Sequence, residues 1–282
     1  MRVWFITGAS RGFGALIVKE ALAAGDAVVA TARNPQTVIS QHGEQPNLLA
    51  VALDVNDEAQ ARAAAKAAIE RFGRIDILLN NAGYGLLGAV EEATTEEIEK
   101  IYRTNVFGLL GVTRAVLPHM RDRRSGHIIN ISSIGGYTGF QGWGVYCSTK
   151  FAIEGLTETL AKELAPLGIK ATVVEPGFFR TDFLDQQSLA VSPLSIADYH
   201  ETAGSMRDFA ADANHAQPGD PARLAKAMIT LAHADNPPLR MPFGTDTVAA
   251  LEEKNAFVAR ELAQWRELAV STDFPAEAGT AA

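Results

Sequence analysis

Short apolar runs alternate with amphipathic or alanine-rich segments along most of this chain. Six runs have the length of buried strands, at residues 2–7, 27–32, 48–53, 75–79, 127–131 and 170–174. Four segments between them follow a helical pattern, at residues 15–24, 57–72, 96–120 and 145–164. The alternation predicts an α/β fold with a doubly wound, Rossmann-like parallel sheet of about seven strands and helices on both faces.

The regular pattern stops between residues 183 and 220, where small and polar residues dominate. Because long irregular segments of compact domains often bind ligands, we expect a substrate loop there. A helix at 221–233, a short strand at 239–242 and a helix at 248–269 follow. We therefore expect a single domain over residues 1–270 and a flexible tail over residues 271–282.

A glycine-rich turn follows the first apolar run. Gly8, Gly12 and Gly14 lie between that strand and the first helix. In this context glycines allow the backbone to approach a pyrophosphate at a helix N-terminus. The spacing G-x-x-x-G-x-G differs from the usual dinucleotide fingerprint, and a purely structural turn is the alternative.

Tyr146 and Lys150 are four residues apart, so a helix that begins near Val145 places them on one face. A tyrosine phenol ionises near pH ~10 in isolation, and a neighbouring ammonium lowers that value. Tyr146 is therefore a candidate general acid or base. Ser133 follows the fifth strand, where it can point into a ligand-binding crevice. Taken alone, the pair fits a solvated helix face better than a catalytic site.

Composition narrows the classes of partner. The chain has 282 residues, 47% of them hydrophobic, and a net charge of −8, which disfavours nucleic acid and anionic membranes. Cys147 is the only cysteine, which excludes an internal disulfide and a cysteine-built metal site. The six histidines have no metal-ligand spacing, so we expect no bound metal. Without a charged leader or an apolar run of membrane-spanning length, a cytoplasmic location is expected.

Seven motifs occur together in one order. They are Thr7-Gly8-x3-Gly12-x-Gly14, Asp54, Asn80-Asn81-Ala82-Gly83, Asn105, Ser133, Tyr146-x3-Lys150 and Pro176-Gly177-x3-Thr181. In this set and order the chain resembles the short-chain dehydrogenase/reductase family, in its common single-domain form. The resemblance extends from residue 2 to about residue 181.

The resemblance implies four catalytic residues. Tyr146 would exchange a proton with the substrate oxygen, and Ser133 would donate a hydrogen bond to that oxygen. Lys150 would bind the nicotinamide ribose hydroxyls and lower the pKa of Tyr146. Asn105 would hold a water that connects Lys150 to solvent.

The resemblance also implies a cofactor site. Asp54 would bind the adenine amino group, Asn80 and Gly83 would build the floor, and Thr181 would meet the nicotinamide carboxamide. The implied cofactor-binding residues are Gly8, Ser10, Arg11, Gly12, Phe13, Gly14, Arg33, Asp54, Val55, Asn81, Ala82, Gly83, Tyr146, Lys150, Pro176, Gly177 and Thr181.

The end of the second strand predicts the choice of cofactor. An acidic residue about 20 residues past the glycine turn selects NAD, but Ala32 lies at that position. Arg33 follows it, and Arg11 lies within the turn, so two guanidinium groups could bind a 2′-phosphate. The sequence therefore predicts NADP(H).

The predicted substrate is a hydrophobic ketone, aldehyde or secondary alcohol. Segments expected near the nicotinamide carry the apolar residues Phe140, Trp143, Phe178, Phe179 and Leu184. A carbonyl reductase or alcohol dehydrogenase is the first hypothesis, and a catalytically idle NADP(H)-binding regulator, a ketoacyl reductase and an epimerase or dehydratase are the alternatives. Family members pair through the 96–120 and 146–164 helices, so a homodimer or homotetramer is expected. Cys147 is interpreted as a packed small residue.

Overall fold

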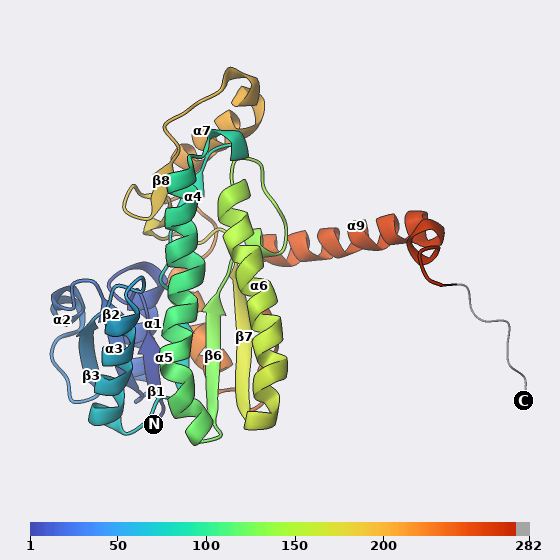
Figure 1. The fold of residues 1–282 in the computed structure, drawn as a ribbon. Coiled ribbons are helices and arrows are strands. Elements are labelled where there is room, and N and C mark those ends of the chain that lie inside the picture. Colours follow the sequence, from blue (N-terminus) through green and yellow to red (C-terminus); the bar gives the residue numbers. More distant parts are fainter. Residues whose placement is uncertain (275–282) are drawn as a thin grey trace, which may run out of the picture.

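The central sheet has the predicted architecture. In this computed structural model, which describes residues 1–274, seven parallel strands are ordered β3-β2-β1-β4-β6-β7-β9 (Figure 1). Their bounds are Val3–Ile6 for β1, Ala27–Ala32 for β2, Leu48–Ala52 for β3, Ile77–Asn80 for β4, Gly126–Ile131 for β6, Ile169–Pro176 for β7 and Arg240–Phe243 for β9. The doubly wound parallel sheet is confirmed.

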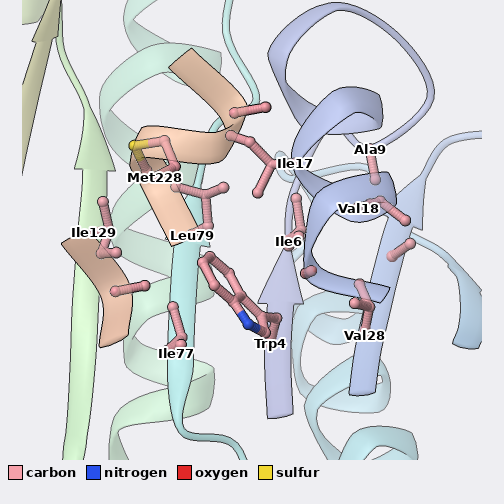
Figure 2. Close-up of a cluster of buried hydrophobic side chains, with 14 of the residues drawn as sticks. Trp4, Ile6, Ala9, Ile17, Val18, Val28, Ile77, Leu79, Ile129 and Met228 are labelled. Carbon is pink, nitrogen blue, oxygen red and sulfur yellow. The ribbon is translucent and has the colours of Figure 1, made fainter. Parts of the chain in front are cut away.

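Helices cover both faces of this sheet because side chains alternate along each strand. On β1, Trp4 and Ile6 pack with α1 and α8 on one face (Figure 2), whereas Val3 and Phe5 pack with α3 and α5 on the other. The helices are α1 (Gly12–Ala23), α2 (Gln36–His42), α3 (Glu58–Phe72), α4 (Thr95–Tyr102), α5 (Leu109–Asp122), α6 (Gly144–Leu164), α7 (Ser205–Ala213), α8 (Pro221–His233) and α9 (Thr245–Val270).

The helix predicted over residues 96–120 is interrupted. It begins at a capping box, where the Thr94 hydroxyl accepts from the Glu97 N–H at 3.2 Å and the Glu97 carboxylate accepts from the Thr94 N–H at 2.9 Å. A π-helical segment, Arg103–Gly108, then separates α4 from α5. Such segments often occur at functional sites, and this one carries Asn105.

The segment 183–220 contains regular structure that its composition does not reveal. Strand β8 (Leu189–Val191) pairs with β5 (Gly85–Leu87) in a second, two-stranded sheet, and α7 follows. Together with α4 this region lies above the carboxyl ends of the main strands (Figure 1). The expectation of an irregular loop was wrong because the strand pairing is non-local and only three residues long.

Helix α9 extends away from the body of the domain (Figure 1). Among the described residues, all of those from 255 to 270 are exposed, including Val258, Leu262 and Trp265. Most of the tail predicted over residues 271–282 lies outside the described residues, which end at 274. None of the described helices combines the length and apolar content that a membrane crossing requires.

Candidate active site

A cavity of about 670 Å³ opens at the carboxyl ends of β1, β4, β6 and β7. It brings together nearly all the residues that the sequence analysis selected. Its lining includes Gly8, Ser10, Arg11, Gly12, Phe13, Arg33, Asp54, Val55, Asn81, Ala82, Gly83, Ser133, Tyr146, Lys150, Pro176, Gly177 and Thr181. Gly14, Asn80 and Asn105 were also selected, and they do not line it.

The glycine turn has a shape that other residues would not allow. Gly8 and Gly12 have φ values of +65° and +53°, in the left-handed region. A Cβ on Gly14 would lie 2.7 Å from Asn81 Nδ2 and would clash with the Gly8 carbonyl, so this glycine lets α1 pack against the turn. No side chain of the described residues caps the start of α1, and its first turn has no acidic residue. Its N–H groups therefore suit a phosphate.

The end of β4 fixes the glycine turn. Asn81 Nδ2 donates to the carbonyls of Thr7 and Gly8 at 2.9 and 3.1 Å, and the Thr7 hydroxyl accepts from the Asn81 and Ala82 N–H groups. Asn80, in contrast, is buried within the sheet, where it donates to Thr113 and Asn130. Asn80 therefore connects β4 to β6 and α5 and does not form the floor that the resemblance implied.

Tyr146 lies in the first turn of α6 with its ring packed between two aromatic side chains. The ring centroids of Trp143 and Phe183 are 5.6 and 5.7 Å from its own. Burial raises the pKa of Tyr146 above its ordinary value, and a hydrogen bond with Ser133 opposes this in part. The phenol therefore holds its proton at neutral pH and can donate it.

Lys150 lies one helical turn beyond Tyr146. Its Nζ donates to the Ile131 carbonyl at 2.9 Å and lies 5.7 Å from the centroid of the Tyr146 ring. Burial lowers the pKa of Lys150 to about 8, and the charge of Glu154 opposes this shift. We expected Lys150 to lower the pKa of Tyr146; among the protein's own groups, burial raises this pKa, and Ser133 is the group that opposes the shift.

Asn105 fixes the segment beside Lys150. Its Oδ1 accepts from the Tyr84 N–H at 3.1 Å, and its Nδ2 donates to the Tyr84 carbonyl and the Thr149 hydroxyl at 2.9 and 3.2 Å. A Cβ on Gly83 would lie 3.1 Å from Asn105 Oδ1 and 3.8 Å from Lys150 Nζ, so both groups border the same glycine. Because both amide hydrogens are used, only Oδ1 can bind the expected water.

The two arginines proposed for phosphate recognition have different surroundings. Arg33 is exposed at the cavity beside Ala32. Arg11 instead donates to the carbonyl and the side-chain oxygen of Gln187 at 2.6 and 3.1 Å. It therefore connects the glycine turn to the segment that precedes β8, a contact that the sequence analysis did not predict.

The half of the cavity next to Tyr146 is apolar. All five predicted residues, Phe140, Trp143, Phe178, Phe179 and Leu184, line the cavity, and the structure adds Tyr84, Phe183, Leu189 and Met206. The last three come from the segment interpreted as a loop. Cys147 is buried in this apolar cluster, and burial raises the pKa of its thiol.

Comparisons with known proteins agree with this geometry. The family model for short chain dehydrogenases matches residues 2–191. A 3-ketodihydrosphingosine reductase of Bacteroides thetaiotaomicron is 37% identical over 86% of this chain and 88% of its own length.

Two solved structures also have the fold. A short-chain dehydrogenase from Streptomyces avermitilis is 39% identical, with a TM-score of 0.88 over 97% of this chain and 100% of that one. The structure of ElxO with NADP bound is 29% identical, with a TM-score of 0.72 over 88% of this chain and 99% of that one. Other structures with this fold contain NAD or NADH, so the fold alone does not select the cofactor.

Proposed function

Because the chain belongs to the short chain dehydrogenase family, we propose that it is an NADP(H)-dependent oxidoreductase of hydrophobic ketones, aldehydes or secondary alcohols. One observation carries the proposal. The buried phenol of Tyr146 lies between Ser133 and an apolar cavity wall, in the cavity that the glycine turn also lines. A proton donor next to apolar surface suits a carbonyl group on an apolar body.

The glycine turn, Asp54, Asn81, Gly83 and Thr181 would hold the cofactor, which supplies the hydride when bound. Tyr146 then donates its proton to the carbonyl oxygen, or accepts one from an alcohol. Ser133 donates a hydrogen bond to the same oxygen and positions it. Lys150 binds ribose hydroxyls through its ammonium group.

The choice of NADP(H) is supported by Ala32 and Arg33 in the cavity wall. Ala32 neither accepts a hydrogen bond from the ribose hydroxyls nor repels a phosphate, and Arg33 supplies a guanidinium. Charge-assisted hydrogen bonds of about 1.5–3 kcal/mol each give an expected preference of one to several decades in kcat/KM. Arg11 contributes with the donors that Gln187 leaves free.

This choice is tested by kcat/KM with NADPH and NADH for the parent and for Ala32→Asp/Arg33→Ala. The parent should strongly prefer NADPH, and the double variant should shift toward NADH. Arg223→Ala, which removes an exposed arginine from α8, serves as the control and should leave the preference unchanged. A parent that prefers NADH would overturn this assignment.

We also propose association through α5 and α6. Phe107, beside α5, and Phe151, on α6, are 62% and 45% exposed. Exposure of apolar surface to water is unfavourable, and such surface often marks a protein–protein interface. Phe151→Asp should reduce the mass measured by light scattering at micromolar concentration. Phe209→Asp on α7 changes an equally exposed phenylalanine, 46%, and should leave the mass unchanged. A monomeric parent would contradict the proposal.

A further inference from the structure

A second cluster of charged side chains lies behind the active site. Arg240 of β9 binds three carboxylates, from Glu154 and Glu158 of α6 and from Glu175 of β7. Its Nη1 contacts Glu154 and lies 2.8 Å from Glu175 Oε1, while Nη2 lies 2.6 Å from Glu158 Oε1. Glu154 and Glu175 are only 4% and 0% exposed, so the cluster is largely buried.

This cluster contains more carboxylate than one guanidinium can neutralise. The Glu158 side chain is 44% exposed and its charge is screened by solvent. Glu154 and Glu175 share Nη1, and within the described residues Glu154 Oε1 and Glu175 Oε2 have no hydrogen-bond partner. Burial raises the pKa of Glu154, and the neighbouring Glu175 charge adds to this shift, while Ser132 and Arg240 oppose it in part. A buried, under-compensated carboxylate favours any further positive charge within reach.

Lys150 carries a positive charge on the same helix, although Arg240 is the cation that binds Glu154 directly. Lys150 lies four residues before Glu154, on the same face of α6, and it is buried. Burial disfavours its ammonium form, and Glu154 is the group whose charge opposes this. The groups around the two residues are Tyr146 and Glu158 on α6, Glu175 on β7, Arg240 on β9, Ser132 after β6, and Tyr137, whose ring lies 5.3 Å from the Arg240 guanidinium carbon.

The end of β6 connects the cluster to the reacting groups. A Cβ on Gly136 would lie 2.8 Å from Glu154 Oε1 and would clash with Ser132 Oγ, so both oxygens border the same small space. The next residue, Ser133, instead directs its hydroxyl toward Tyr146. The Ile131 carbonyl, one residue before Ser132, accepts from Lys150 Nζ. Along the chain, Ile131 thus contacts the lysine, Ser132 borders the carboxylate cluster, and Ser133 faces the phenol.

We infer that Glu154 is a positioning residue for Lys150, whose ammonium form it stabilises from behind the active site. The inference rests on the proposed function, in which the charged Lys150 binds the cofactor ribose. An ionised Glu154 favours a protonated Lys150. Its removal therefore makes Lys150 lose its proton at lower pH, and the alkaline limit of cofactor binding moves down.

The test uses Glu154→Gln, with NADPH affinity measured by nicotinamide fluorescence across pH and kcat/KM measured where a substrate is known. The alkaline limb of both profiles should move down by about one pH unit. Glu154→Asp keeps the charge, so its alkaline limb should lie close to that of the parent. Glu158→Gln is the matched control, because it removes the same charge from the same arginine at an exposed position farther from Lys150, and its limb should match the parent.

Unchanged limbs in Glu154→Gln, or equal shifts in both glutamine variants, would overturn the inference. The binding profile does not require turnover, so a protein that binds NADPH but reduces no carbonyl would refute the proposed function while this test still applies. Glu154→Gln should fold, because it removes one negative charge from a cluster with excess carboxylate. If it does not fold, Glu154→Met carries the same expectation.

Discussion

Replacing Tyr146 by phenylalanine is expected to lower kcat by roughly 10²–10⁴-fold and to leave NADPH affinity nearly unchanged. The ring stays packed between Trp143 and Phe183, so the variant loses the proton donor and little else. Ser133 cannot replace it, because a serine hydroxyl is too weak an acid for this role.

Tyr84→Phe is the matched control for that measurement. Tyr84 lines the same cavity, and its backbone, not its hydroxyl, is held by Asn105. The control should keep kcat close to that of the parent. A Tyr146→Phe enzyme with most of its turnover would refute the proposed acid, whereas a loss in both variants would indicate a general effect on the cavity.

Lys150→Ala should weaken NADPH binding by about ten- to a hundredfold, because a charge-assisted hydrogen bond contributes about 1.5–3 kcal/mol. It should also lower kcat, because Tyr146 loses its only cationic neighbour within the first turns of α6. Lys100→Ala, an exposed lysine that also lines the cavity, should leave both quantities nearly unchanged.

The effect of Lys150→Ala on binding and turnover should depend on pH. The pKa of Lys150 is about 8, so the parent carries the ammonium below that pH and loses it above. The advantage of the parent over Lys150→Ala should therefore be greatest below pH 8 and shrink at higher pH, where residual alcohol oxidation by the variant should improve. Identical pH profiles for parent and variant would exclude the electrostatic role of the lysine.

Local patterns were enough to predict most of the framework. The apolar run 27–32 and the helix at 221–233 have the same bounds as β2 and α8, because burial on both faces and a strong apolar stripe leave little choice. The seven-stranded order then places the selected residues at one edge of the sheet.

Contacts between distant segments were beyond the sequence analysis. The pairing of β5 with β8 joins two strands that lie about a hundred residues apart in the chain. Each strand has only three residues, which is too short for an alternation of apolar and polar residues to be recognised. The contact between Arg11 and Gln187 was not predicted either, because these residues lie far apart in the chain. Arg240 meets Glu154 and Glu175 only after β9, α6 and β7 have assembled.

Two signals for the buried cluster were nevertheless present. Glu154 repeats the four-residue spacing of Tyr146 and Lys150 on one helix face, and Glu175 directly follows the apolar pair Val173-Val174. A carboxylate at either position requires a partner in the folded protein. Neither position says which residue that partner is, because Arg240 lies far along the chain.

The most direct test of the central claim is consumption of NADPH with a panel of carbonyl compounds, followed at the nicotinamide absorbance band. The panel pairs long-chain apolar ketones and aldehydes with small charged keto acids, and the reverse reaction uses NADP⁺ with the corresponding alcohols. We predict turnover of the apolar compounds, little with the charged ones, and none of comparable rate in Tyr146→Phe. Binding of NADPH without turnover in either direction would contradict the account and indicate a catalytically idle cofactor-binding protein.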